Sequence, residues 1–173
     1  EIDAGRTYLD TEPGGREQSL RLDTEHYRRL VSKDGPLADR ESVTWQEVGH
    51  MPLCLLTTEM QNRRIIDEQL REAVVDLVPR LESDSVIVLI AHVRTGKWTS
   101  VMPARLADVL GVSKNVRTIP IVDPVVKHSI GLVVPHRNPL TPLINALVAE
   151  AKQLVPVLEG IASAKTPEET LGA

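Results

Sequence analysis

The sequence contains very few aromatic residues. Only 2% of its 173 residues are aromatic, and phenylalanine is absent. A hydrophobic core must therefore consist of aliphatic side chains, and the hydrophobic fraction of 42% is ordinary for a chain long enough to bury one core. The same scarcity argues against an aromatic platform on which the bases of single-stranded nucleic acid could stack.

Positive charge is scarce as well. The chain has 20 Lys and Arg residues against 24 Asp and Glu residues, and its formal net charge is −4. A domain that binds the phosphate backbone of DNA or RNA normally carries a basic patch or a clear excess of positive charge. The composition therefore gives no sign that this chain itself binds nucleic acid.

Cysteine occurs once, and no apolar run is long. The single thiol, Cys54, excludes an internal disulfide and fits a reducing cytoplasm. A reactive thiol is the alternative, but the setting MPLCLL favours a buried, small hydrophobic side chain. No run approaches the roughly 20 residues that span a bilayer, and the acidic first residues lack the apolar region of a signal peptide. We predict a cytoplasmic chain without membrane contact, and we expect a fragment, because it opens without Met in a strand-like segment.

Strand-like and helical segments alternate along the chain. Short apolar or alternating runs predict strands over 6–10, 51–56, 79–83, 98–102, 115–124 and 127–135, and two strands with a turn within 20–39. Helical periodicity and end signals predict helices over 42–49, 58–73, 85–93, 103–111 and 142–160. This alternation is typical of an α/β fold with a largely parallel sheet.

Several of these helices have capping signals at their starts. Suitable N-cap residues are Ser42 or Thr44, Thr58 with Gln61 in capping-box spacing, Ser83 or Asp84, and Thr141. The segment SVIVLIAHV is ambiguous, because its β-branched residues also suit a strand. Its length and the stop at Gly96 favour a helix.

Three predicted strands end where a helix is expected to begin. These transitions are Leu56-Thr57, Glu82-Ser83 and Met102-Pro103. Ligands of open parallel sheets bind outside the carboxyl ends of the strands. The best candidate is therefore the segment TTEMQN, 57–62, where free backbone N–H groups and the positive helix end suit a small carboxylate or another anion. An ordinary capped helix without a ligand is the alternative.

Charged residues around this segment allow two interpretations. Glu59 opposes an anion unless its carboxylate points to solvent. Arg63 and Arg64 either steer an anion towards the helix start or form a solvated helix face.

No pattern indicates a metal site or a catalytic centre. The five histidines lack the paired spacing of metal ligands, and we expect His92, inside an apolar helix, to be a core residue. Asp123, His128 and Ser129 have the side chains of a hydrolase triad, but no G-x-S-x-G nucleophile elbow accompanies them. Glycine-rich phosphate-binding loops are also missing. We expect no enzyme activity, no cofactor and no metal.

Three longer segments together resemble a known family. They are LVSKDGPLADRESVTWQEVGHMPLCLLTTEMQNRRIIDEQL, VLIAHVRTGKWTSVMPARLADVLG and VVKHSIGLVVPHRNPLTPLINALVAEAKQL. In this order they resemble the effector-binding, or substrate-binding, domain of LysR-type transcriptional regulators. The shared features are a hydrophobic-P-x-A/H-x-P-L strand, a helix opening W-x-E/D-L, an apolar helix before a G-x-G-type turn, and a strand ending in a hydrophobic residue and proline. Only one glycine of that turn is kept, Gly96 in TGKW. The resemblance covers about Asp3 to Leu154.

The resemblance implies an α/β fold similar to type II periplasmic binding proteins, with two subdomains joined by two crossing strands. It implies a first crossing strand at 1–12, the second effector subdomain at 13–135, a C-terminal helix of the first subdomain at 136–160 and a flexible tail at 161–173. The rest of the first subdomain and a DNA-binding winged helix-turn-helix would precede Glu1.

The resemblance also implies the function of a ligand-sensing regulatory domain. A small, often anionic effector would bind in the cleft between the subdomains, within a homodimer or tetramer, and DNA would be bound only through the missing N-terminal domain. The effector role falls on Thr57, Thr58, Met60, Gln61 and Asn62, with Ser83 and Pro103 as weaker candidates. A solute-binding protein of a transporter has a similar scaffold and is the alternative, although the missing signal peptide speaks against it.

Overall fold

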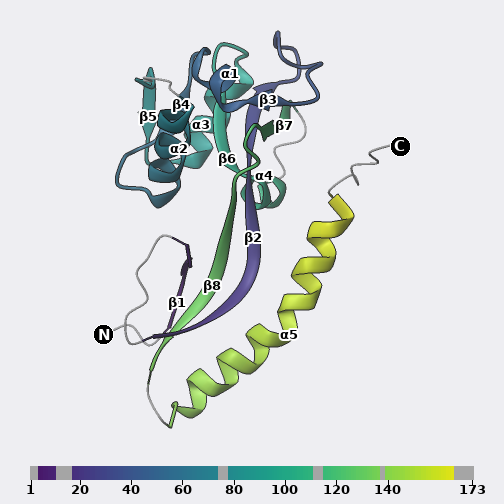
Figure 1. Cartoon of the computed structure of the whole chain (residues 1–173). Coiled ribbons are helices and arrows are strands. Elements are labelled where there is room, and N and C mark those ends of the chain that lie inside the picture. The colour runs from purple at the N-terminus through teal and green to yellow at the C-terminus, as the bar shows by residue number, and fades with distance from the viewer. Residues whose placement is uncertain (1–3, 11–16, 74–77, 111–114, 137–138, 166–173) are drawn as a thin grey trace. The chain divides into compact units, whose positions relative to one another are not determined.

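The computed structural model describes residues 4–10, 17–73, 78–110, 115–136 and 139–165, shown in Figure 1. The chain divides into two compact units. The first unit is formed by Glu1–Glu25 and His128–Ala173, and the second unit by His26–Lys127. Both boundaries therefore fall inside the range 13–135 that we expected for the second subdomain.

A single long strand, β2 (Glu17–Ser32), replaces the two strands and the turn that we expected within residues 20–39. Buried and more exposed residues alternate from Asp23 to Arg29 without interruption, and the turn-forming residues come only after Ser32. The first part of β2 belongs to the first unit, and the part from His26 onwards belongs to the second.

The strands of the second unit contribute to a mixed main sheet, not the largely parallel one that we expected, and two of them form a separate two-stranded sheet. β2 is antiparallel to β6 (Ser100–Pro103) and to β7 (Val116–Val122). The parallel pairs are β7 with β3 (Val43–Thr44) and β4 (Cys54–Leu56) with β5 (Leu81–Ser83). The antiparallel pairs arise because β2 enters the unit directly from the first unit, whereas β4, β5 and β6 are linked through helices, which favours parallel strands.

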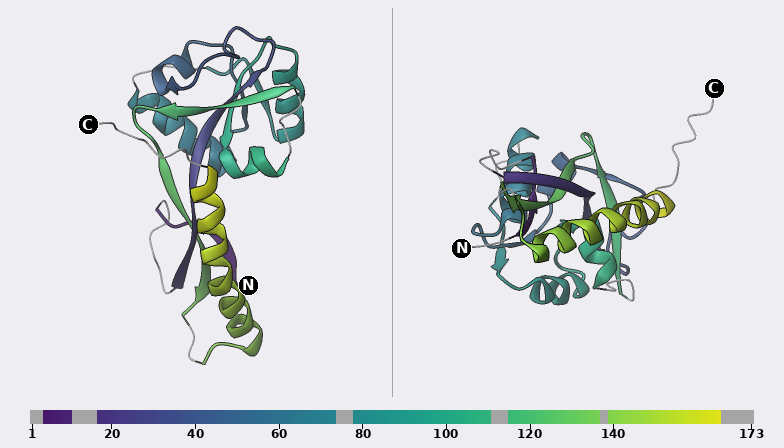
Figure 2. Two further views of the ribbon diagram at one scale, coloured as in Figure 1. Left: turned by 90° about the vertical axis from the view of Figure 1, so that its right-hand side faces the viewer. Right: turned by 90° about the horizontal axis from the view of Figure 1, so that it is seen from below.

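Helices cover both faces of this sheet, as Figures 1 and 2 show. Successive side chains of a strand point to opposite faces. On one face of β2, Tyr27 donates to Asn62 of α2 (Gln61–Glu72), and Arg29 donates to the Glu47 carbonyl of α1 (Trp45–Gly49). On the other face, Leu30 packs with residues of α3 (Val86–Arg94) and α4 (Ala104–Val109). The second unit thus has three layers, with the sheet in the middle.

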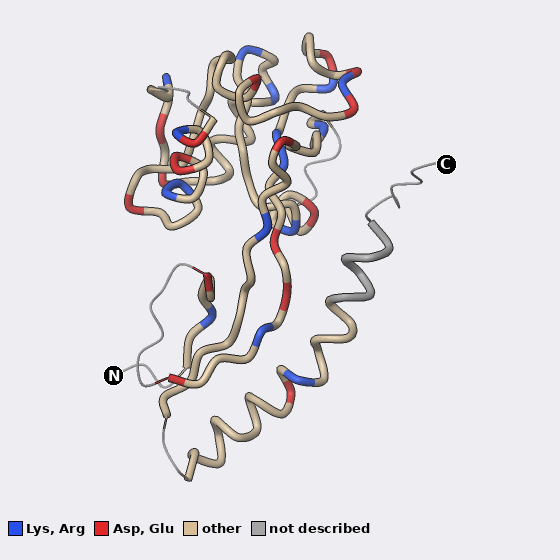
Figure 3. The backbone as a smooth tube through the Cα atoms, in the orientation of Figure 1, with Lys and Arg blue, Asp and Glu red and all other residues tan. Residues whose placement is uncertain are grey.

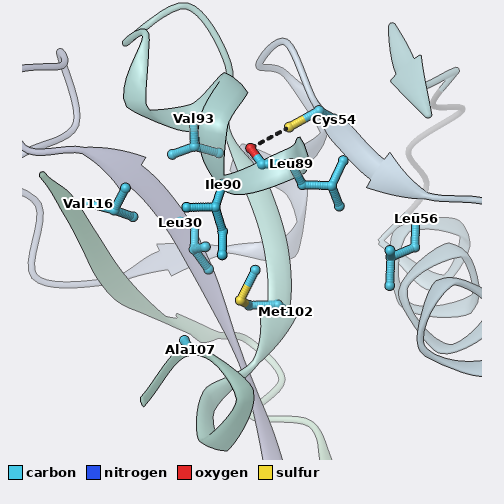
Figure 4. Packing of buried hydrophobic residues seen from close by; sticks show 9 residues of the cluster. All are labelled: Leu30, Cys54, Leu56, Leu89, Ile90, Val93, Met102, Ala107 and Val116. Carbon is cyan, nitrogen blue, oxygen red and sulfur yellow. Dashed lines mark hydrogen bonds between the residues drawn. The ribbon is translucent and has the colours of Figure 1, made fainter. Parts of the chain in front are cut away.

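The core on the α3 and α4 side contains no aromatic residue among its buried members, in keeping with the composition. Figure 4 shows Ile90 of α3 close to Leu30 of β2, with Met102 of β6 beside them. Each large aliphatic side chain buried in this way contributes about 1.5–3 kcal/mol. The buried members of the cluster are Leu30, Cys54, Leu56, Leu89, Ile90, Val93, Met102, Ala107 and Val116.

Two predicted helix starts have different outcomes. At α1, Thr44 is the N-cap and forms a complete capping box with Glu47, which confirms that prediction. The capping box predicted for Thr58 and Gln61 is wrong, because α2 begins only at Gln61 with Met60 as its N-cap. A separate turn precedes this helix, closed by the Met60 N–H on the Thr57 carbonyl at 3.0 Å.

The ambiguous segment around Ile90 is a helix, α3, as its length favoured. Its N-cap is Ser85, so neither Ser83 nor Asp84 takes the predicted capping position. At its other end, Gly96 has φ of +75°, a conformation that favours glycine, and its N–H bonds the Val93 carbonyl at 3.0 Å.

In the first unit, β1 (Gly5–Tyr8) is antiparallel to β8 (Lys127–Pro135), and β8 lies between β1 and β2 in the sheet. The helix α5 (Pro142–Lys165) packs Ile144 and Ala151 into one buried cluster with Leu132 and Val134 of β8. The Thr141 hydroxyl accepts from the Ile144 N–H at 3.4 Å, as predicted for this helix start.

The helix α5 is longer than predicted. It continues through Pro156 to Lys165, so residues 161–165, expected in a flexible tail, are helical. Proline removes one helical hydrogen bond, but it does not end the helix here. Residues 166–173 of the predicted tail, and residues 1–3 and 11–12 of the predicted crossing strand, lie outside the described residues. Among the described helices, none is long and apolar enough to cross a membrane.

The two threonines at predicted caps allow a direct test. We expect Thr44→Ala to lower the free energy of unfolding by about 1 kcal/mol, because the N-cap bond is lost. The matched control Thr58→Ala should change it by less than about 0.5 kcal/mol, because Thr58 is exposed and caps no helix. Urea unfolding followed by circular dichroism measures both, and equal losses would contradict the assignment of the cap.

Candidate functional site

Three strands of the second unit end at one edge. β4 and β5 pair in parallel, and their last residues, Leu56 and Ser83, are partners. A parallel bridge between Leu53 and Thr99 aligns the segment before β4 with the segment before β6. The carboxyl ends of β4, β5 and β6 therefore point the same way, and α2, α3 and α4 begin after them (Figure 1). This edge brings together the three strand ends predicted from the sequence.

The helix starts at this edge share one property. The N-cap residues of α2, α3 and α4 are Met60, Ser85 and Pro103, and none makes a side-chain cap bond. None of these helices has an acidic residue in its first turn. Three helix starts without a side-chain cap, and with them three positive helix ends, therefore lie at this edge.

The loop from Thr57 to Met60 presents the predicted site residues. Thr58 and Met60 are exposed, and Thr57, Gln61 and Asn62 are partly exposed. The exposed Arg64 guanidinium donates to the carbonyls of Thr58 at 3.4 Å and Glu59 at 3.3 Å, which fastens the loop to α2. Loop and helix start therefore form one connected surface.

A negative charge stands beside this surface. A bond from its own backbone N–H, and then one from the Thr57 hydroxyl, lower the pKa of the fully exposed Glu59 carboxyl. Glu59 is therefore ionised at neutral pH and opposes an anion near the loop. The Thr57 hydroxyl is already engaged, whereas its neighbour Thr58 is exposed.

Arg63 has neither of the two roles that we considered for it. Its side chain is only 6% exposed and donates to Asp67 at 2.7 Å, to the Leu56 carbonyl at 2.6 Å and to Glu82. Burial lowers the pKa of this guanidinium, but the bonds with Asp67 and Glu82 outweigh that effect and the pKa is raised. Arg63 thus joins the ends of β4 and β5 to α2, and it supports the edge from inside.

A tyrosine that the sequence reasoning missed joins two of the predicted site residues. Tyr27 is the strand partner of Pro103, and its hydroxyl donates to the Asn62 amide oxygen at 3.5 Å. The alternation along β2 was the signal that could have indicated an inward-pointing Tyr27. Pro103 is buried. At Ser83, the hydroxyl accepts from the Ser85 N–H at 3.1 Å.

The other candidate residues are engaged elsewhere. His128 and Ser129 interact with Asp10 of the first unit, through a 3.9 Å approach of the imidazole and a 2.5 Å bond from the Ser129 N–H. His92 is not a core residue as predicted. It is partly exposed on α3, bonds the Val88 carbonyl at 2.8 Å and meets the Trp98 ring edge-on.

Metal and nucleic-acid chemistry find no support in the part of the chain that the structure describes. No group of three or more His, Cys, Asp or Glu residues there could hold a metal ion. Figure 3 shows basic and acidic residues interspersed along the backbone in that part of the chain.

Cys54 is fully buried in the aliphatic core, as predicted (Figure 4). Its sulfur lies 3.4 Å from the Thr99 carbonyl oxygen and 3.8 Å from that of Leu89. Burial raises the pKa of the thiol to about 11. Because the thiolate is the reactive form, this cysteine is inert at neutral pH in the folded chain.

Comparison with known proteins identifies relatives along most of the chain. A family model described as LysR substrate binding domain matches residues 1–156. The chain is 29% identical over 115 residues to a probable nitrogen assimilation transcriptional activator of Synechococcus elongatus. That match covers 66% of this chain but only 37% of the relative, so the chain spans well under two thirds of its length.

Solved structures share the fold at low sequence identity. The reduced regulatory domain of OxyR from Pseudomonas aeruginosa has a TM-score of 0.72 and 19% identity, with 88% of this chain and 72% of that chain covered. The effector-binding domain of QuiR in complex with shikimate has a TM-score of 0.72 and 20% identity, with coverages of 90% and 72%. The CcmR regulatory domain of Synechocystis PCC6803 in complex with 2-PG has a TM-score of 0.77 and 14% identity, with coverages of 90% and 74%.

The buried thiol leads to a simple labelling prediction. We expect iodoacetamide at pH 8 to leave Cys54 unmodified in the native chain and to alkylate it once urea unfolds the chain, because only unfolding exposes the thiol and restores its ordinary pKa. Mass spectrometry of the intact chain counts the added groups. Rapid alkylation in native buffer would contradict the buried position.

The neighbouring arginines of α2 should differ in their importance for stability. Arg63→Gln should lower the free energy of unfolding by about 2 kcal/mol, because it removes charge-assisted bonds to Asp67, Glu82 and a buried carbonyl. Arg64→Gln, one residue along on the exposed side, is the matched control and should cost less than about 0.5 kcal/mol. Urea unfolding of both variants measures these changes. A larger loss of free energy of unfolding for Arg64→Gln than for Arg63→Gln would contradict the supporting role of Arg63.

Proposed function

The chain belongs to the LysR substrate-binding domain family, and from that membership we propose that it senses a small, anionic effector for a transcriptional regulator. The effector binds at the edge where β4, β5 and β6 end. Three helix starts without side-chain caps at this edge carry the proposal. The positive ends of helices that carry no side-chain cap and no acidic residue in the first turn are complementary to a carboxylate or a similar oxyanion.

The proposed effector contacts fall into two groups. Thr58, Gln61 and Asn62 offer hydrogen bonds, and the exposed Met60 supplies apolar surface, whereas the buried Pro103 supports this edge from within. Thr57 and Ser83 contribute less, because their hydroxyls already bond Glu59 and the Ser85 N–H. The exposed, negatively charged Glu59 disfavours ligands that would place a negative charge close to it.

Two solved relatives support a small-molecule ligand of this kind. The QuiR structure holds shikimate, and the CcmR structure holds 2-PG. The comparisons lend no support to the alternative of a transporter's solute-binding protein. Sensing by oxidation of Cys54 is disfavoured, because that thiol is buried and its pKa is raised.

The remaining parts of the proposal concern the whole regulator. We propose that it acts in the cytoplasm as a homodimer or tetramer, that it binds DNA through a separate N-terminal domain, and that it catalyses no reaction. The chain covers 37% of its relative, a transcriptional activator, which is compatible with further domains. Exposed apolar side chains on α3, Ile87 at 72% and Val88 at 39%, offer a surface for contact between copies.

A binding experiment tests the proposed site. A thermal-shift screen of the chain against small carboxylates, including shikimate, selects a ligand, and calorimetry then measures its dissociation constant. We expect Thr58→Val to weaken binding about tenfold, because it removes one hydrogen bond to a charged group.

Thr118→Val is the matched control. Thr118 pairs with Leu30 of β2, and Leu30 also pairs with Ser100, the first residue of β6. Thr118 therefore lies near the start of β6, whereas the proposed site lies at the end of β6. The Thr118→Val variant should bind the ligand with the same affinity as the unmodified chain. Equal affinity of the Thr58 and Thr118 variants would refute the site, and the absence of any carboxylate ligand would refute the proposed ligand class.

A further inference from the structure

Two chain segments connect the units covalently. One is β2, which passes from Glu25 to His26, and the other is the start of β8, which passes from Lys127 to His128. Glu25 and His128 are therefore the residues of the first unit at the two junctions. They lie 103 positions apart along the sequence (128 − 25).

One side chain of β1 reaches both junction residues. The Tyr8 hydroxyl donates to the Glu25 carboxylate, and its ring meets the His128 ring edge-on, with centroids 5.9 Å apart and planes at 84°. Because β8 lies between β1 and β2 in the sheet, the Tyr8 side chain on β1 reaches across β8 to Glu25 on β2. Tyr8 and Glu25 are both buried, so water competes little with their hydrogen bond.

The two residues after Tyr8 hold the beginning of β8 as well. The Leu9 N–H donates to the Ser129 carbonyl at 2.8 Å, and the Asp10 carboxylate accepts from the Ser129 N–H at 2.5 Å. The same carboxylate lies 3.9 Å from the His128 imidazole. The Leu9 side chain covers Gly131, where an added Cβ would lie 2.6 Å from a Leu9 methyl carbon.

We propose that Tyr8, Leu9 and Asp10 form a brace that ties the two connecting strands together where they leave the first unit. Glu25 on β2 is held by the Tyr8 hydroxyl, and His128 and Ser129 on β8 are held by the Tyr8 ring, Leu9 and Asp10. A displacement of β2 at Glu25 is thereby passed through Tyr8 to the start of β8. This conformational device does not depend on the ligand or on the effector site.

Amide hydrogen exchange of the chain, measured residue by residue by NMR, tests the brace. Tyr8→Phe keeps the ring and removes the hydroxyl. We expect exchange of the Leu9 and Ser129 amides to become about tenfold faster, because a hydrogen bond to a charged group is lost at the brace. The amides of α2 in the second unit should be unchanged.

Glu25→Gln is the sharper variant. It alters β2 only, yet the brace predicts faster exchange at Ser129, whose N–H bonds Asp10 and not Glu25. Tyr27→Phe removes the other tyrosine hydroxyl, which bonds Asn62 in the second unit, and it should leave Leu9 and Ser129 unaffected. The proposal is overturned if Tyr8→Phe or Glu25→Gln leaves Ser129 exchange unchanged, or if either speeds exchange equally in α2.

Discussion

The uninterrupted extension of β2 is the constraint on which the rest of the structure depends. One strand of 16 residues serves both units, and its two-residue periodicity fixes which side chain points where. Glu25 accepts a hydrogen bond from Tyr8 in the first unit, Tyr27 faces α2 and Arg29 faces α1. Leu30, on the other face, packs into the aliphatic core with α3. A one-residue slip in the register of β2 would turn each of these side chains to the wrong face.

Buried arginines then hold the elements of the second unit together. Arg29 is fully buried and donates to the Glu47 carbonyl at 3.3 Å and to the Thr99 hydroxyl at 2.9 Å. Burial lowers its pKa to about 10, against the attraction of Glu47, so the guanidinium still carries its charge at neutral pH. Arg63 serves the ends of β4 and β5 in the same way. Both use the rigid, multiply donating fork of arginine, which lysine does not have.

Local patterns predicted most of the elements, because they depend on near neighbours in the sequence. The Thr44 cap, the helical nature of α3, the stop at Gly96 and the burial of Cys54 all follow from residues within a few positions. The mixed sheet, by contrast, depends on the direction in which β2 enters the second unit, which no local pattern records. The cap predicted at Thr58 failed because the Thr57–Met60 turn competes with the helix for the same residues. The burial of Arg63 depends on Glu82, 19 positions away.

The positions of Arg63 and Arg64 change how the candidate site would work. Arg63 adds little long-range attraction, since it is paired with Asp67 and Glu82, and the charge of the exposed Arg64 acts close to the opposite charge of Glu59. The nearby Glu59 and the net charge of −4 would repel a simple anion at a distance. What remains attractive is short-ranged and directional, namely the N–H groups at the uncapped helix starts. The proposed sensor therefore selects its ligand by hydrogen-bond geometry at the edge and not by charge alone, because an oxyanion that fails to meet these N–H groups experiences only the repulsion.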